Sequence, residues 1–346
     1  MSIYIIRNNL EKRLSDFPLL PLSNPKYLQY LASYLKLDVE FLMGCINGYY
    51  IFSPVFIKKS RWCGLSRFLR YGNNSPFGLA GSPLLLKDWV SSDIYLDFPI
   101  LRSGLSALIA FLFRELGLKY VKLKVSTYPH RFSDDKLINL APYGHNIHFL
   151  LNLSSADYLM ETKDISEYWK KIGKKSRNTI RKAERYGFKF RVGNQSDVDA
   201  FFSLWKDELY KKHGIGVGVG PEFLLGLMNK MRDEALLTVI EDRRGEFLGG
   251  AFSLIYKRAI TFLMWATKEE IQRLGSKNYL IWKTVEYALQ NKGIRIIDYG
   301  ESLRGSGSAS FKMHMGGEEY TTIEIRAFKK PYHLFVHSPF RALIGF

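Results

Sequence analysis

The sequence predicts an α+β protein with α/β/α layers, built from two similar domains that each hold a mixed, mostly antiparallel sheet flanked by helices. Three observations lead to this prediction. The 346 residues are enough for two domains of roughly 150 residues each. A content of 47% hydrophobic and 24% charged residues is typical of a folded globular chain and excludes a disordered one. Strand and helix periodicities also follow one another in an order that occurs twice.

In the second half, alternating apolar residues predict strands, and apolar residues three or four apart predict helices. The expected elements are a strand at 187–192, helices at 196–211 and 222–231, a meander of strands at 236–241, 247–256 and 260–266, a helix at 276–292, a strand at 294–298, an irregular Gly/Ser-rich segment at 305–310, and a strand at 320–328. The tight polar links between the three meander strands predict antiparallel pairing.

The first half repeats this order more loosely. It predicts a helix at 25–35, strands at 40–46, 50–57 and 77–86, a helix at 105–115, and strands at 120–125 and 146–151. We therefore expect an N-terminal domain at 1–164, a basic connecting helix at 165–186, a C-terminal domain at 187–328, and a basic, apolar tail at 329–346.

Positive charge is concentrated in the expected connecting helix. The chain carries a net charge of +17, and residues 166–191 hold 10 basic and 2 acidic side chains. On one helix, the following cations would form a single stripe: Lys170, Lys174, Arg177, Arg181 and Arg185. Such a stripe suits the phosphates of a donor or acceptor, for example coenzyme A, a phosphorylated precursor or tRNA. A solvated linker helix is the alternative.

Several motifs resemble those of FemAB-like proteins, which have tandem domains of the GNAT acyltransferase superfamily. They are the basic stretch from Trp169 to Gly187, Trp265 followed by Ser276, Asn278 and Trp282, the sequence DYGES at 298–302, and FKMHMGG at 311–317. Together these motifs span roughly residues 165–328. The element order is also similar to that of GNAT domains.

The resemblance implies an N-acyltransferase that moves an acyl or aminoacyl group to an amino group of a small metabolite, glycan or cell-envelope precursor by direct attack in a ternary complex. The donor would be a co-substrate: acyl-CoA, an acyl-carrier protein or aminoacyl-tRNA. An aminoacyl-tRNA-dependent peptidyltransferase is the first alternative. A non-catalytic basic binding protein is the second.

Three residues are candidates for catalysis. The resemblance assigns Lys312 the stabilisation of the oxyanion, a task suited to a fixed ammonium group. Asp298 and Glu301 could accept the proton of the acceptor amine. The alternatives are a surface lysine for Lys312, a contact to the loop backbone for Asp298, and an ion pair with Arg304 for Glu301.

The expected substrate contacts come from Trp265, Asn278, Tyr299 and His213, and the expected donor contacts from the cationic stripe and Arg273. The resemblance also implies a pyrophosphate loop at 267–278, where only Gln272, Arg273 and Gly275 match the usual Q/R-x-x-G-x-G/A pattern. Coenzyme A binding in the usual GNAT mode is therefore doubtful.

No metal site is expected, because His145 and His148 would point to opposite faces of a strand. The longest uncharged apolar run, residues 104–113, is about half of what a transmembrane helix needs, so we expect no transmembrane segment. With only two cysteines, the protein is expected in the cytoplasm. The tail at 329–346 could contact an anionic membrane at its inner face, or pack back on the domain.

Overall fold

The computed structural model describes residues 2–6, 21–46, 49–59, 70–73, 84–87, 98–118, 120–126, 147–214 and 219–329. The chain divides into two compact units. The first consists of Met1–Leu19, Leu28–Ala156 and Tyr320–Phe346, and the second of Leu20–Tyr27 and Asp157–Glu319. The expected tail lies beyond the described residues, apart from its first residue.

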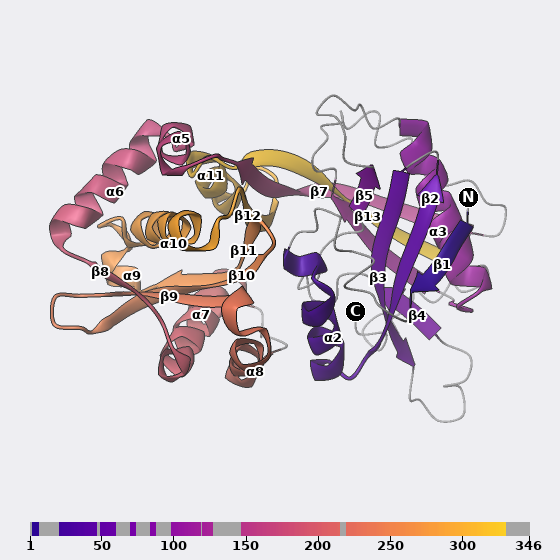
Figure 1. The fold of residues 1–346 in the computed structure, drawn as a ribbon, viewed down its shortest axis with the longest axis horizontal. Helices are drawn as coiled ribbons and strands as arrows, with labels where there is room; N and C mark the ends of the chain where they lie inside the picture. Colours follow the sequence, from indigo (N-terminus) through magenta and orange to yellow (C-terminus); the bar gives the residue numbers. More distant parts are fainter. Residues whose placement is uncertain are drawn as a thin grey trace. The chain divides into compact units, whose positions relative to one another are not determined.

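The first unit is built on a sheet whose strands follow the order β1-β2-β3-β4-β6-β13-β7, with β5 beside β3 (Figure 1). The strands are β1 (Ser2–Ile6), β2 (Asp38–Ile46), β3 (Tyr49–Lys59), β4 (Arg70–Asn73), β5 (Leu84–Lys87), β6 (Tyr120–Ser126), β7 (Ile147–Glu161) and β13 (Glu318–Lys329). A helix, α2 (Pro25–Tyr34), precedes β2, and another, α3 (Phe98–Arg114), precedes β6.

Helix α3 supplies the core of the first unit. Its residues Leu105, Leu108, Ile109 and Leu112 recur every three or four positions, so they form one buried stripe. They pack against residues of β2, β3, β6 and β13, among them Leu123. Each such side chain, when fully buried, contributes roughly 1.5–3 kcal/mol to the hydrophobic stabilisation of the unit.

The second unit has the strand order β7-β12-β11-β10-β9-β8. Its strands are β8 (Lys189–Val192), β9 (Ala235–Glu241), β10 (Phe247–Tyr256), β11 (Ala259–Thr267) and β12 (Ile296–Leu303), with the end of β7. Its α-helices are α5 (Ile165–Lys171), α6 (Lys174–Tyr186), α7 (Val198–His213), α8 (Pro221–Met231), α9 (Glu269–Gln272), α10 (Ser276–Lys292) and α11 (Gly307–His314).

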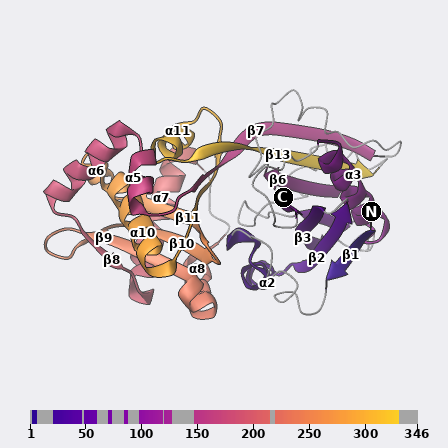
Figure 2. The same ribbon diagram turned by 45° about the horizontal axis from the view of Figure 1, so that its top comes forward.

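Helices cover both faces of the sheet in the second unit. Figure 1 shows α10 on one side of β9 and β10, and α7 and α8 on the other. Figure 2 shows α6 beside α10, on the outside of this layer. This is the layered α+β arrangement that the sequence predicts.

The two units repeat one pattern of strand pairing. In the first, β1 to β4 pair antiparallel in succession, and the chain then passes through α3 to β6, which pairs parallel with β4. In the second, β8 to β11 pair antiparallel, and the chain passes through α10 to β12, which pairs parallel with β11. A parallel pair needs such a crossover connection. The prediction of two similar domains is therefore confirmed.

The limits of the units differ from the expected domains. The expected connecting helix at 165–186 is two helices, α5 and α6, and both belong to the second unit. The expected last strand of the C-terminal domain, 320–328, belongs to the first unit, because it pairs antiparallel with β6. The expected irregular segment at 305–310 includes the start of helix α11.

Candidate functional site

Lys312 is a buried ammonium group on helix α11. The Ser306 hydroxyl caps this helix by accepting from the Ala309 N–H at 3.1 Å, and Ala309 and Lys312 share its buried face. The side chain of Lys312 is 3% exposed, and its Nζ donates to the carbonyl oxygens of Gly300 and Glu301, each at 2.8 Å. Burial lowers the pKa of Lys312 to about 8, against the opposing effect of the charges on Asp298, Asp157 and Glu301.

Asp298 shapes the turn that holds Lys312. It lies in β12 and is buried, with one carboxylate oxygen accepting from the Thr261 hydroxyl and the other from the Gly300 N–H, both at 2.8 Å. Gly300 has φ +75°, a conformation that favours glycine. Burial raises the pKa of Asp298, while these two hydrogen bonds and the charge of Lys312 oppose the rise. These contacts correspond to the loop-binding alternative for Asp298.

Aromatic rings surround the ammonium of Lys312. Its Nζ lies 5.6 Å from the ring centre of Trp265 and 5.8 Å from that of Tyr158. Trp265 lies 6.3 Å from Phe311 and meets Phe262 edge to face at 5.6 Å. A desolvated cation–π contact stabilises the charged form by roughly 2 kcal/mol. Of the expected substrate contacts, Trp265 is therefore the one that directly borders Lys312.

Tyr299 and Asn278, two other expected substrate contacts, bind Met315 at the end of helix α11. The Tyr299 hydroxyl donates to the Met315 carbonyl at 2.8 Å and lies 3.2 Å from the Tyr168 hydroxyl. Burial raises the pKa of Tyr299 well above its ordinary value. Asn278 places its Nδ2 3.3 Å from the Met315 Sδ. For Tyr299, the structure thus shows a core residue where we expected a substrate contact.

Glu301 and His213 are the two remaining candidates of the predicted site. Glu301 is half-buried and binds Lys312 through its main-chain carbonyl, while Arg304 donates to Glu319 at 2.9 Å. His213 is the last residue of α7, and its side chain lies outside the described part of the chain.

The basic residues do not lie on one helix, which corrects the expected single stripe. Lys170 belongs to α5, and the other four belong to α6. The chain breaks between the helices because Ile172 is extended and the Gly173 N–H donates to the His314 carbonyl at 2.9 Å.

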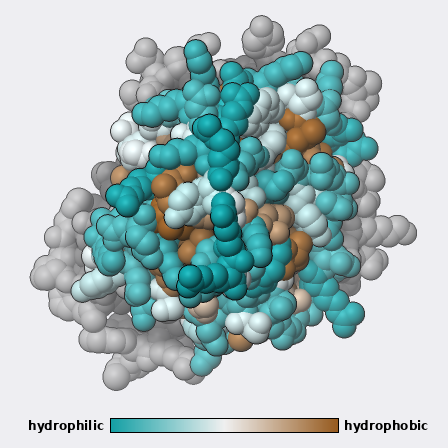
Figure 3. Space-filling model, turned by 90° about the vertical axis from the view of Figure 1, so that its left-hand side faces the viewer, coloured by the Kyte–Doolittle hydropathy of each residue, from teal (hydrophilic) through white to brown (hydrophobic). Residues whose placement is uncertain are grey.

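Most of these cations still face solvent. Lys170, Lys174, Arg181 and Arg185 are exposed, as is Arg273. Arg177 is half-buried and donates to the carbonyls of Trp169 and Lys170 at the end of α5. Figure 3 shows mostly hydrophilic residues, around small apolar areas, on the side of the second unit that carries α6.

The start of helix α10, where the sequence retains only part of a pyrophosphate loop, is covered by helix α6. Gly275 has φ +88°, and a Cβ placed there would lie 2.5 Å from Thr179 Cγ2 and 2.7 Å from the Thr179 carbonyl oxygen. The Lys182 ammonium donates to the Arg273 carbonyl at 3.4 Å and ties the two segments together. These contacts fill the side of the helix start on which α6 lies.

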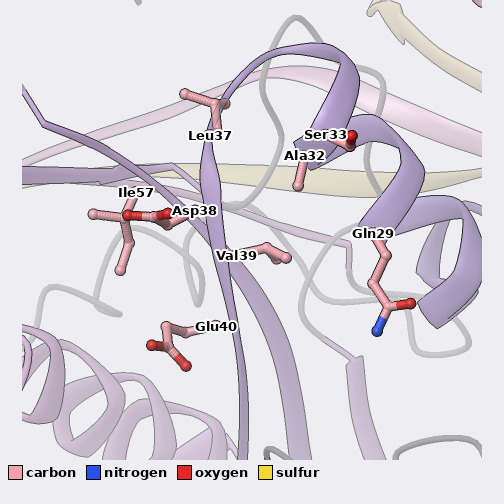
Figure 4. Close-up of a pocket in the computed structure, with 8 residues that line it drawn as sticks. All are labelled: Gln29, Ala32, Ser33, Leu37, Asp38, Val39, Glu40 and Ile57. Carbon is pink, nitrogen blue, oxygen red and sulfur yellow. The ribbon is translucent and has the colours of Figure 1, made fainter.

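A cavity of about 480 Å³ lies in the first unit (Figure 4). It is lined by Gln29, Ala32, Ser33, Leu37, Asp38, Val39, Glu40 and Ile57. Figure 4 shows Val39 on the side of β2 toward Gln29, with Asp38 and Glu40 on the other side, as expected for a strand. None of the residues predicted for catalysis or binding lines this cavity.

Among the described residues, no three His, Cys, Asp or Glu side chains gather as metal ligands would. The helices of the described ranges also include none with the length and apolar character to cross a bilayer.

Comparison with known proteins finds one family-domain match and several similar folds. Residues 170–313 match the family model described as an Acetyltransferase (GNAT) domain. The crystal structure of FemX matches with a TM-score of 0.66 and 11% identity, over 97% of this chain and 99% of that one. A conserved protein of unknown function from Bacteroides thetaiotaomicron matches with a TM-score of 0.55 and 14% identity, over 95% and 100% of the two chains. No curated protein sequence matches the chain.

Residues 170–313 therefore carry an acyltransferase domain of the GNAT superfamily. The fold of the whole chain is similar to that of FemX.

No sequence motif marks two charged residues near this site, Glu208 in α7 and Lys277 in α10. They form an ion pair at 3.1 Å. A signal for Glu208 was present, because it follows Trp205 by three residues and so extends the apolar stripe of the predicted helix. An acidic residue on such a stripe needs a buried partner.

Proposed function

We propose that the protein transfers an acyl or aminoacyl group to an amino group of a small metabolite, glycan or cell-envelope precursor, with both substrates bound together. The observation that carries this proposal is the buried ammonium of Lys312, held by two carbonyls between two aromatic rings. Two of its three N–H groups donate to the carbonyl oxygens of Gly300 and Glu301 in the turn. Among the described residues, the third has no hydrogen-bond acceptor, so it can donate to a substrate oxygen.

In the proposed reaction, the acceptor amine attacks the carbonyl carbon of the donor, and a C–N bond forms. The carbonyl oxygen becomes an oxyanion, which the Lys312 ammonium stabilises. The tetrahedral intermediate then collapses, the bond from carbon to the leaving oxygen or sulfur breaks, and the proton lost by the amine ends on the leaving group. A fixed donor in a site shielded from water stabilises such an oxyanion by about 3–4 kcal/mol.

Asp298 acts in this proposal as a positioning residue. Both of its carboxylate oxygens already accept hydrogen bonds, and one of them holds the turn at Gly300, whose carbonyl accepts from Lys312. Its negative charge also favours the charged form of Lys312.

The test is a kinetic comparison of Lys312→Met with wild type at saturating donor. We expect kcat to fall by a factor of about 10² to 10³, the usual cost of losing one oxyanion donor. Lys206→Met, at an exposed position on α7, is the matched control and is expected to keep full activity. Unchanged turnover in Lys312→Met would exclude the proposed role.

Aminoacyl-tRNA is the donor that two observations favour. Exposed cations line α5 and α6, and α6 covers the start of α10, against which coenzyme A would place its pyrophosphate in the usual mode. We expect tRNA binding to weaken steeply with salt, and to weaken further when Arg181 and Arg185 are both changed to Glu. Tight acetyl-CoA binding without tRNA affinity at low salt would reject this donor.

A further inference from the structure

The hydrogen bonds of Lys312 determine where its amine points in both protonation states. Its Nζ donates to the carbonyl oxygens of Gly300 and Glu301, each at 2.8 Å. In the ammonium form, the third N–H is the group that the proposed function directs at a substrate oxygen. The neutral amine has only two N–H groups, and the same two carbonyls use both of them. Its lone pair therefore takes the third position and points at the substrate.

The surroundings of Lys312 favour the neutral amine more than water does. The side chain is 3% exposed, and burial lowers its pKa to about 8. The charges that oppose this shift are those of Asp298 and Glu301 in β12 and Asp157 in β7. Within the described ranges, however, no carboxylate forms an ion pair with Lys312. No direct contact with a carboxylate therefore retains the proton on this amine.

Two aromatic rings border the amine of Lys312. The ring centres of Trp265 and Tyr158 lie 5.6 and 5.8 Å from Nζ, and the Tyr158 hydroxyl donates to Glu319 at 2.9 Å. The proposed function places the carbonyl group of the acyl donor in contact with Nζ. Two reacting atoms that a site holds about 3–3.5 Å apart react as an intramolecular pair. The outcome then depends on whether the carbonyl meets the ammonium or the neutral amine.

We propose that Lys312 is a site of self-acylation: when no acceptor amine is bound, its neutral form takes the acyl group from the donor. The inference rests on the proposed function, because that function places the donor carbonyl at Lys312. The Nζ lone pair attacks the carbonyl carbon, and a C–N bond forms. The bond from this carbon to the oxygen or sulfur of the leaving group breaks, and one proton of Nζ ends on the leaving group.

The product of this reaction is an amide that stops transfer. The acylated nitrogen carries no charge and a single N–H, so it cannot stabilise an oxyanion and also cannot donate to both Gly300 and Glu301. Removal of the acyl group requires hydrolysis of the amide by a separate deacylase. Self-acylation would thus switch the protein off when the donor is abundant and the acceptor is scarce.

The test uses wild type without acceptor and needs no substitution. The protein is incubated at pH 8 with one of three probes: p-nitrophenyl acetate, acetyl-CoA or bulk aminoacyl-tRNA. Peptide mass spectrometry then measures the acylated fraction of Lys312 and of two control lysines. Lys206 is the exposed control. Lys277 is the buried control, because its side chain is 21% exposed and pairs with Glu208, whose charge favours the protonated form.

With at least one probe, the acylated fraction of Lys312 is expected to exceed that of either control about tenfold, because only the neutral amine is a nucleophile. The dependence on pH gives a second measurement. The rate of acylation at Lys312 is expected to be half-maximal near pH 8 and to level off above it. In an unstructured peptide, the rate at lysine continues to rise up to pH 10.

Three results would overturn the inference: no acyl group on Lys312 with any of the probes, equal acylation of Lys312 and either control, or a rate at Lys312 that rises up to pH 10. Loss of transfer in Lys312→Met, without acylation of Lys312 in wild type, would refute this inference and leave the proposed function standing. Acylated Lys312 in wild type, with unchanged turnover in Lys312→Met, would do the reverse.

Discussion

The buried charge of Lys312 predicts a specific dependence of stability on pH. In the folded protein the pKa of Lys312 is about 8, and in the unfolded chain it returns to its ordinary value of 10.5. Between these two values the unfolded chain holds a proton that the folded chain has released. The free energy of unfolding therefore rises with pH across this window, and below pH 8 the cost of burying the charge is present in full.

The expected size of the rise is roughly 3 kcal/mol, because each unit of pKa shift corresponds to about 1.4 kcal/mol. Lys312→Met removes the titrating group and keeps a side chain of similar length. The measurement is urea unfolding of wild type and Lys312→Met, followed by tryptophan fluorescence at several pH values from 7 to 10.5. The contributions of other titrating groups cancel in the difference between the two curves.

That difference is expected to grow with pH in favour of wild type, with most of the change above pH 8. A difference that is the same at every pH would refute the reasoning, because it would mean that the pKa of Lys312 is the same in the folded and unfolded chains.

Two other substitutions test the surroundings of the site. Asp298→Asn removes a negative charge that keeps the pKa of Lys312 from falling further. The alkaline limit of transfer activity is therefore expected to move to lower pH in a pH–rate profile. A limit at the same pH as in wild type would contradict this expectation. Gly275→Ala forces φ +88° on alanine and a clash with Thr179, and is expected to cost more than about 2 kcal/mol of stability in urea unfolding. Gly293→Ala, at φ +62° in open space, is expected to cost about 1 kcal/mol, and equal losses would argue against the clash.

The regular elements of the second unit were predictable from the sequence because local patterns decide them. The strands at 236–241, 247–256 and 260–266 and the helix at 276–292 occur within a residue or two of the expected limits. Helix α11 was not predictable in this way, because its first turn is rich in Gly and Ser, which favour loops. What stabilises this helix is the cap at Ser306 and the burial of Ala309 and Lys312.

Within the site, the sequence pointed to Lys312 and Trp265 through their motif positions, and the structure brings these two side chains together. It could not indicate the pairing of Glu208 with Lys277, because 69 positions separate them and only the meeting of two helix ends joins them. The sequence also could not indicate the break between helices α5 and α6. Gly173 leaves the helical path because its N–H binds the distant His314 carbonyl, a contact that helical periodicity does not encode.

The place of strand β13 in the chain has a consequence for the order of events during synthesis. Residues Thr322 to Phe328 pair with β6 in the first unit, yet they follow the whole of the second unit in the sequence. The ribosome therefore releases every residue of the second unit before the first unit can complete its sheet. A nascent chain that stops near residue 319 has all the residues of the second unit, and in the first unit the β6 edge lacks its partner. The sheet of the first unit, which holds most of the N-terminal half, is therefore the last to be completed during synthesis.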